Sequence, residues 1–428
     1  MSLQEKIIEI LKDEVVPAMG CTEPVAVALA CAKLKEVWEL EEIGQIEVLV
    51  SPNIYKNGLG VGVPNTNEAG LDIAAALGIV AGRSSKGLEV LEDITKKDVI
   101  KAHKLIRENK LKIIIKDTKE KVYIEANMKL KNINSRVIIQ DKHSNFTYIE
   151  KNKEIIYEKK SNKKSKGKDL YLLKNQKITD IIKAIEAIDY KKLEFLLEGI
   201  EMNENIALKG LNEKLGIGVG YSIKKSMDKG LISKDLINDA MMFTAAGADA
   251  RMSGVNMPVM SSNGSGNNGL TAILPIVSYK RRFNETNENL IKALAISHII
   301  NCYIKSYIGR LSALCGCSVA ASTGSSAAIT WLMGGDYNQI NGAIKNMIAN
   351  ISGMICDGAK GSCALKVSTS ASVAIQSAIL AIDDSITFSK NGIIAETVED
   401  TIKNLGTISK EGMDSTDGVI LDIMKNMA

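Results

Sequence analysis

The feature of this sequence that most constrains its fold is an abrupt change in hydrophobic periodicity. Between residues 111 and 158, short runs rich in β-branched residues alternate with polar turns, in LKIIIKD, KVYIEANMK, SRVIIQD, NFTYIEK and KEIIYEK. Runs of this length and spacing are typical of antiparallel strands joined by short turns. The segment therefore predicts a β-meander, and QIEVLVS at Gln45–Ser51 predicts a further strand.

Most of the remaining chain has the 3.6-residue periodicity of amphipathic helices. Residues 3–18 predict a first helix, which Pro17–Gly20 interrupts, and a second helix is expected from Cys21 to about Val37. An alanine-rich helix is expected at 67–82. Beyond residue 170, helical windows follow one another at 177–199, 204–227, 233–248, 286–310, 318–333, 338–355, 368–382 and 396–425.

The length of the chain indicates more than one domain. A chain of 428 residues is too long for one ordinary hydrophobic core. We predict an α+β fold, in which a large all-helical domain carries a smaller α+β module that contains the antiparallel meander. The helices of residues 1–39 are assigned to the helical domain, residues 40–165 to the module, and residues 170–428 to the rest of the helical domain.

The charge pattern argues against nucleic acid and membrane partners. The formal net charge is only +4, and the densest basic run, Lys159–Lys168, lies among Ser, Asn and Gly, as in a solvated linker. We find no apolar stretch approaching the roughly 20 residues that span a bilayer, and the charged N-terminal helix does not resemble a signal peptide. We therefore expect a cytoplasmic protein. A homodimer is one arrangement that the sequence leaves open.

Seven cysteines are distributed unevenly along the chain. An odd number in a long intracellular chain argues against a disulfide framework. Cys31 and Cys302 lie inside apolar helical patterns and are expected to be core thiols. The others lie in breaks between expected helices, where thiols are more often ligands or nucleophiles: Cys21, Cys315, Cys317, Cys356 and Cys363.

Thiolates supplied by loops hold soft metals and iron–sulfur clusters. The spacing here contains no CxxC, so on its own it leaves an iron–sulfur cluster, zinc and no metal as alternatives. Three protein thiolates on a four-iron cluster would leave one iron free to act as a Lewis acid. Cys21 stands apart at an expected helix start, where the helix dipole favours a thiolate that could act as nucleophile or base. The alternative is a thiol that packs in a turn.

Three segments rich in Gly, Asn and Ser are candidates for binding a small polar ligand. They are Gly60–Gly70, Ser261–Gly269 and Ala321–Ser326. Backbone N–H groups of such loops can converge on an anion, and an amino-acid carboxylate would suit them, although ordinary turns have the same composition. The candidate side chains are Asn65, Asn67, Asn267, Asn268, Ser322 and Thr323. None of the segments matches a P-loop or a dinucleotide-binding motif.

Taken in order, PAMGCTEPVAVALACA, GVGVPNTNEAG, SGNNGLTAILP, ALCGCSVAASTG and ISGMICDGAKGSCALKVSTSA resemble the L-cysteine desulfidase family. That family is related through its helical domain to the iron–sulfur L-serine dehydratases. The similarity spans nearly the whole chain. It implies a [4Fe–4S] cluster on three cysteines and a separate N-terminal cysteine that acts as the base.

Carried over to this sequence, the resemblance makes Cys21 the base and Cys356 and Cys363 cluster ligands. The third ligand belongs to the ALCGC segment, where Cys315 is preferred because it ends the helix at which the related dehydratases place theirs. Cys317 is the alternative.

The implied reaction is the β-elimination of L-cysteine to pyruvate, ammonia and hydrogen sulfide. The substrate thiolate would bind the open iron while Cys21 removes the α-proton. Thr22 and Glu23 would orient the base or receive the substrate ammonium. L-serine dehydration by the same mechanism is one alternative. The other is a zinc-stabilised helical protein that binds small amino acids without catalysis. Because no Lys stands in a recognisable Schiff-base context, pyridoxal phosphate is not expected.

Overall fold

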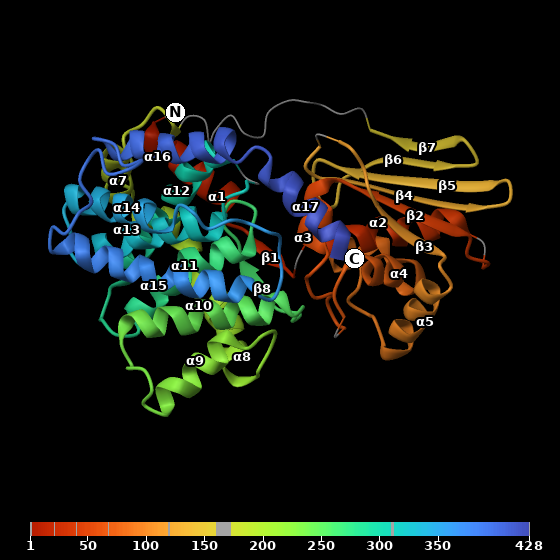
Figure 1. Cartoon of the computed structure of the whole chain (residues 1–428), viewed down its shortest axis with the longest axis horizontal. Helices are drawn as coiled ribbons and strands as arrows, with labels where there is room; N and C mark the ends of the chain where they lie inside the picture. Colours follow the sequence, from red (N-terminus) through yellow and green to blue (C-terminus); the bar gives the residue numbers. More distant parts are fainter. Residues whose placement is uncertain are drawn as a thin grey trace.

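The computed structural model describes residues 2–427 except Cys21, Leu40, Asn67, Lys119, residues 160–172, Arg310 and Leu311. The chain forms a helical part and a sheet-bearing part that lie side by side (Figure 1). The predicted α+β class with a largely helical remainder is confirmed. Of the basic run, all but Lys159 lies outside the described residues, as do two of the predicted site residues, Cys21 and Asn67.

The sheet-bearing part is built on six strands in the order β3-β2-β4-β5-β6-β7. Their bounds are Gln45–Val50 (β2), Leu111–Ile115 (β3), Tyr123–Leu130 (β4), Ile133–Gln140 (β5), Phe146–Lys151 (β6) and Glu154–Glu158 (β7). Strands β4 to β7 form the predicted antiparallel meander. The first run, β3, instead pairs in parallel with β2 at the edge of the sheet. The connection between them is a long helical crossover, as parallel pairing requires.

Helices cover one side of this sheet, with α2, α4 and α5 beneath it in Figure 1. The bounds of the helices in this part are Thr22–Trp38 (α2), Pro52–Gly58 (α3), Leu71–Ala81 (α4), Ser84–Glu89 (η1) and Lys96–Arg107 (α5). Helix α2 contacts α4, β4 and β5. Gly78 allows the close approach of α4 to α2, because a Cβ there would lie 2.3 Å from the carbonyl oxygen of Ala28.

The position of α2 corrects our assignment of residues 1–39 to the helical domain. Of these residues, α1 (Leu3–Glu14) and the chain that follows it as far as Ala18 pack against the helical core. Helix α2 is buried on nearly all sides, including Cys31, and belongs to the core that contains the sheet. A helix that is apolar all round needs cover on every face, and the sheet and α4 together provide it.

The helical part contains most of the remaining chain. Its helices are Ile178–Glu186 (α7), Tyr190–Leu196 (η2), Leu197–Asn212 (α8), Val219–Asp228 (α9), Leu236–Met252 (α10), Gly266–Lys280 (α11), Asn287–Ile308 (α12), Cys317–Ala321 (η3), Ser322–Leu332 (α13), Tyr337–Ile351 (α14), Cys363–Ile382 (α15), Val398–Thr407 (α16), Ile408–Gly412 (η4) and Thr416–Met427 (α17). After residue 200, the strand found in the described chain is β8 (Pro258–Met260), which pairs with β1 (Pro17–Met19). Helix α11 had no predicted counterpart, because its sequence is apolar on every face and contains Pro275.

Helix α15 corrects the expectation that no apolar stretch is long enough to cross a membrane. By length and composition alone, among the described residues Cys363–Ile382 passes that test. The helix contacts α10, α13 and α14, and 56% of its apolar window is buried inside the protein. The core helix of a soluble protein has the same properties.

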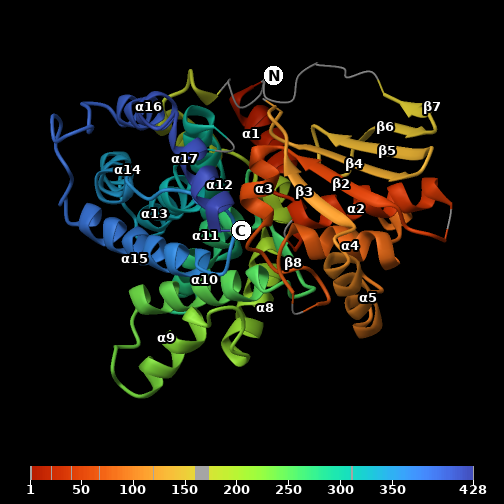
Figure 2. The same ribbon diagram turned by 45° about the vertical axis from the view of Figure 1, so that its right-hand side comes forward.

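The two parts meet along a surface that positions the candidate site. The Gly60–Gly70 loop lies against the helical part, where Gly60 bridges Lys360 and the N–H of Gly62 donates to Met252 O at 2.9 Å. Helix α17 contacts α3 where the parts meet, and its Leu421 enters the core of the sheet-bearing part. Helix α17 lies beside α3 in both views of the molecule (Figures 1 and 2).

Candidate functional site

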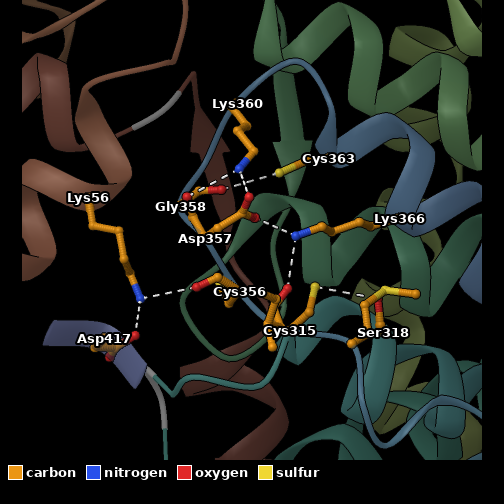
Figure 3. Close-up of polar contacts among 12 residues, drawn as sticks. Lys56, Cys315, Ser318, Cys356, Asp357, Gly358, Lys360, Cys363, Lys366 and Asp417 are labelled. Carbon is orange, nitrogen blue, oxygen red and sulfur yellow. Dashed lines mark hydrogen bonds and ion pairs between the residues drawn. The ribbon is translucent and has the colours of Figure 1, made fainter. Parts of the chain in front are cut away.

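The cysteines of the ALCGC and MICDGAKGSC segments are held together by backbone pairing. The N–H of Cys315 donates to Met354 O at 2.8 Å, and the N–H of Cys356 donates to Ala313 O at 2.7 Å. These bonds form an isolated antiparallel bridge between two loops that flank α13 and α14. Cys315 and Cys356 are therefore fixed on adjacent segments, as Figure 3 shows.

Cys363 closes the loop from the other side. It begins α15, its N–H donates to Lys360 O at 2.9 Å, and its thiol donates to Gly358 O at 3.6 Å. Gly358 has a φ of +97°, and a Cβ on it would lie 2.1 Å from Lys56 O. A glycine is required there for both reasons, because the loop turns sharply while packed against the sheet-bearing part.

The thiols of this loop region interact with one another. The Cys317 thiol donates a hydrogen bond that lowers the pKa of Cys315, whereas the same bond and burial raise the pKa of Cys317 far above its usual range. Burial raises the pKa of Cys363 to about 11 and also raises that of Cys356, with further contributions from the charge of Cys315. The structure thus gathers four thiols, including both candidates for the third ligand.

Lysines surround these thiols. Lys366 forms an ion pair with Asp357 and donates to Ile355 O at 2.8 Å, while Lys360 forms an ion pair with the same carboxylate. Lys56 donates to Cys356 O at 3.4 Å (Figure 3). The positive charges of Lys56 and Lys366 act on Cys356 in the direction that lowers its pKa. Burial nevertheless outweighs these charges and leaves the pKa of Cys356 raised, so that of these four thiols only Cys315 is shifted toward the thiolate.

The gathered donors are of the chemical type that soft metals take. Within the described part of the chain, no three His, Cys, Asp or Glu side chains are grouped so that they could hold a single metal ion. The gathered groups are nevertheless all thiols on loops, and cationic side chains lie beside them. Iron–sulfur clusters take such ligands, and a four-iron cluster spaces its ligand sulfurs more widely than a single ion does. Cys315, Cys356 and Cys363 could therefore hold a cluster.

The predicted substrate residues Thr22, Glu23 and Asn65 lie in the sheet-bearing part and make different contacts. Thr22 opens α2, and its hydroxyl donates to Glu23 Oε2 at 3.3 Å. Asn65 adopts a left-handed backbone, and its amide donates to Leu91 O at 3.0 Å and Glu92 O at 3.1 Å. Asn65 also lines a cavity of about 50 Å³ beside Gly20. Its side chain therefore anchors the loop close to the residue that precedes Cys21.

Asn267 and Asn268 lie in the first turn of α11 rather than in a loop. The carbonyl oxygen of the Asn267 side chain accepts a hydrogen bond from Arg251 Nη1 at 3.1 Å, and its Nδ2 lies 3.5 Å from Met252 Sδ. The side-chain nitrogen of Asn268, Nδ2, is buried without a hydrogen-bond partner among the described residues. Both side chains are thus turned into the protein, one of them toward a buried cation.

The prediction of a ligand-binding loop at 321–326 is wrong. Ser322 and Thr323 lie in α13 with fully buried side chains, and their hydroxyls donate to the backbone carbonyls of Ser318 and Val319, one turn earlier. Small residues serve close helix packing here, because a Cβ on Gly324 would lie 2.2 Å from Ser297 O of α12. The composition of a turn and that of a tight helix contact are similar, which misled the prediction.

Arg251 is a buried residue of this region that sequence reasoning missed. It lies near the end of α10, it is 7% exposed, and its Nη2 donates to Gly20 O at 2.9 Å. Its neighbour Met252 packs with Val61 against Cys363. Arg251 therefore links the residue before Cys21 to Asn267, close to the cysteine loop. The available signal was a pair of charged residues, Asp249 and Arg251, in the largely apolar run MMFTAAGADARM.

His298 is a second missed residue. It is fully buried on α12, its Nδ1 lies 2.8 Å from Ser262 Oγ, and Asn301 Nδ2 donates to the same hydroxyl at 2.8 Å. Burial lowers the pKa of His298 to about 3, so that the imidazole is neutral near neutral pH. The signal in the sequence was a histidine and an asparagine three residues apart in an apolar helix.

Comparisons with known proteins show the family of the chain. The family model described as serine dehydratase alpha chain matches residues 85–422, a range that contains the cysteine loop and begins after Cys21. A UPF0597 protein of Alkaliphilus oremlandii is 57% identical, over 100% of this chain and 99% of its own length. UPF0597 proteins of Clostridioides difficile (55%; 98% and 99%) and Clostridium tetani (45%; 99% and 99%) are similar over nearly the whole of both chains. The chain therefore belongs to the serine dehydratase alpha chain family, and its full-length relatives show that it is one of the UPF0597 proteins.

Proposed function

We propose that this protein is an iron–sulfur lyase that eliminates the β-substituent of a small amino acid, with L-cysteine as the substrate and pyruvate, ammonia and hydrogen sulfide as the products. The observation that carries the proposal is the gathering of Cys315, Cys356 and Cys363 from two paired loops. Membership of the serine dehydratase alpha chain family supports a lyase-type reaction in general.

The proposed cluster ligands are Cys356, Cys363 and Cys315, with Cys317 as the alternative to Cys315. When bound, a [4Fe–4S] cluster would supply a Lewis acid that polarises the leaving heteroatom of the substrate. Lys56 and Lys366 stand beside the thiols and would offset the negative charge of a thiolate-bound cluster. The backbone pairing of the two loops would keep the thiols in place before the cluster binds.

The proposed base is Cys21, which would take the α-proton of the substrate. The carbonyl of Gly20, directly before it, is held by Arg251. Thr22 and Glu23, which are hydrogen-bonded to each other, would orient the base or receive the substrate ammonium. Asn65, Asn67, Asn267 and Asn268 are the polar side chains proposed near the substrate. The 2-aminoacrylate that leaves the site would hydrolyse to pyruvate and ammonium.

L-serine is a second candidate substrate, and the description of the matching family favours it. Serine and cysteine present the same carboxylate and ammonium and differ in the leaving heteroatom. Both substrates would use the same residues, because both place that heteroatom at the cysteine loop. One assay of pyruvate formation therefore has to compare L-serine with L-cysteine.

Anaerobically purified protein should be assayed for pyruvate with L-cysteine and with L-serine, and for sulfide with L-cysteine. We expect stoichiometric pyruvate and sulfide from L-cysteine, and loss of turnover after exposure to air. Pyruvate from L-serine alone would assign the dehydratase reaction. A zinc-containing protein that forms no pyruvate from either amino acid would contradict the proposed function.

A further inference from the structure

We infer that Arg251 binds the carboxylate of the amino-acid substrate and so orients the substrate between Cys21 and the cysteine loop. The inference rests on the proposed function, because it takes an amino acid as the ligand. It is carried by the burial of Arg251, by the partners of its guanidinium, and by its position.

A guanidinium remains charged at every physiological pH, and burying a charge without a counter-charge is costly. Arg251 is 7% exposed. Its hydrogen bonds go to two neutral acceptors, Gly20 O and the Asn267 amide oxygen. Within the described residues no carboxylate pairs with it, and its buried Nε has no hydrogen-bond partner. The site is therefore short of one anion.

The absence of a side chain at position 266 fixes where the guanidinium of Arg251 lies. Gly266, which opens α11, faces it directly, and a Cβ at that position would lie 2.3 Å from Nε and 2.8 Å from Cζ. Any larger residue at 266 would displace the side chain of Arg251. The planar guanidinium can donate two parallel hydrogen bonds to a carboxylate, which is the geometry that arginine provides and lysine does not.

Arg251 also lies where a substrate carboxylate is needed. It contacts the residue before the proposed base on one side, and its neighbour Met252 contacts the proposed ligand Cys363 on the other. A carboxylate held here would lie beside Gly20, the residue that precedes the proposed base, and next to the residue that contacts Cys363. Buried polar groups close to α11, such as the unpartnered amide of Asn268, would complete the polar environment.

The test separates the carboxylate from the rest of the substrate. Two probes carry the thiol of L-cysteine. The first, 3-mercaptopropionate, has a carboxylate and no amine. The second, cysteamine, has an amine and no carboxylate. Their dissociation constants should be measured by calorimetry on the anaerobic holoenzyme. Arg251→Gln should raise the Kd of 3-mercaptopropionate roughly 10- to 100-fold, the range expected for loss of a charge-assisted hydrogen-bonded pair. The Kd of cysteamine should change less than about twofold.

A second variant keeps the arginine and therefore the fold. Asn267→Asp places a carboxylate against Arg251, where it competes with the ligand, so it should also weaken 3-mercaptopropionate selectively. Arg282→Gln removes an arginine that pairs with Asp239 at the surface and should leave both constants unchanged. Equal weakening of both probes by Arg251→Gln and Asn267→Asp would show that Arg251 only supports the fold and would overturn the inference.

The outcome for wild-type protein distinguishes this inference from the proposed function. Pyruvate formation by wild type together with unchanged binding of 3-mercaptopropionate to Arg251→Gln overturns the inference and leaves the function standing. Absence of pyruvate formation and of binding of L-cysteine, L-serine and both probes to wild type overturns both.

Discussion

Lys56 Nζ lies 2.7 Å from Asp417 Oδ1, and this ion pair ties the sheet-bearing part to the C-terminal helix beside the cysteine loop. The side chain of Lys56 is 3% exposed, whereas that of Asp417 is 37% exposed. Lys56 also donates to Cys356 O, so the pair supports the backbone of a proposed ligand. The C-terminal helix therefore contributes to the site without reaching the thiols themselves.

Asp417→Asn should destabilise the protein by on the order of 1–2 kcal/mol, because it leaves the charge of Lys56 buried without its partner. The effect is expected to be smaller than for a fully buried pair, since water already screens Asp417. Thermal or denaturant unfolding measures it. Asp422→Asn is the matched control, because Asp422 pairs with Lys425 in an exposed position on the same helix. Equal stability of the two variants would contradict the role given to Lys56.

The choice between Cys315 and Cys317 can be made with single alanine variants. Cys315→Ala should lose bound iron, because Cys315 lies in the segment that pairs with the Cys356 loop. Cys317→Ala should keep its iron, since Cys317 begins the π-helical turn η3. Cys302→Ala, which removes a thiol buried in α12, is the control that should keep the full iron content. The reverse pattern, with iron lost only from Cys317→Ala, would assign the third ligand to Cys317.

Protonation of His298 should make the stability of the protein depend on pH. Burial lowers the pKa of this residue from 6.5 in the unfolded chain to about 3. Its contribution is therefore complete above pH 6.5 and is lost as the pH falls toward 3, at about 1.4 kcal/mol per pH unit. Denaturant unfolding across this range should show a shallower pH dependence for His298→Gln. His143→Gln is the control, and equal pH dependence in wild type and His298→Gln would exclude the effect.

Cys21→Ser separates catalysis from cluster binding. The variant should keep the cluster absorption and lose turnover by on the order of a hundred- to ten-thousand-fold, because an alcohol is a far weaker base than a thiolate near neutral pH. Pyruvate assays and the visible spectrum of the same sample provide the two readings. Loss of the cluster would make Cys21 a ligand, and unchanged turnover would place the base elsewhere.

Much of the fold followed from hydrophobic periodicity. The runs between 111 and 158 are short, rich in β-branched residues and separated by polar turns, so the meander β4–β7 could be predicted. Helices α2 and α11 are buried on almost every face and lack such a pattern. For that reason the sequence could indicate neither the partner of α2 nor the helical state of the residues after Ser265.

The residues of the candidate site could be predicted from the sequence to different degrees. Cys315, Cys356 and Cys363 stood out because thiols in glycine-rich breaks have few structural uses. Arg251 and His298 could not be found in this way, since their significance depends on burial and on neighbours far away in the chain. Ser322 and Thr323 were misjudged because their hydroxyls bond to their own helix, which composition does not reveal.

The central claim is that the cysteine loop holds an iron–sulfur cluster on which elimination depends. The most direct measurement is the iron and acid-labile sulfide content of anaerobically purified wild type, Cys356→Ala and Cys363→Ala, with a pyruvate assay on each sample. The account predicts about four iron and four sulfide per wild-type chain, and loss of both cluster and pyruvate formation in the two variants. Full iron and sulfide content in both variants, or pyruvate formation by protein without iron, would contradict it.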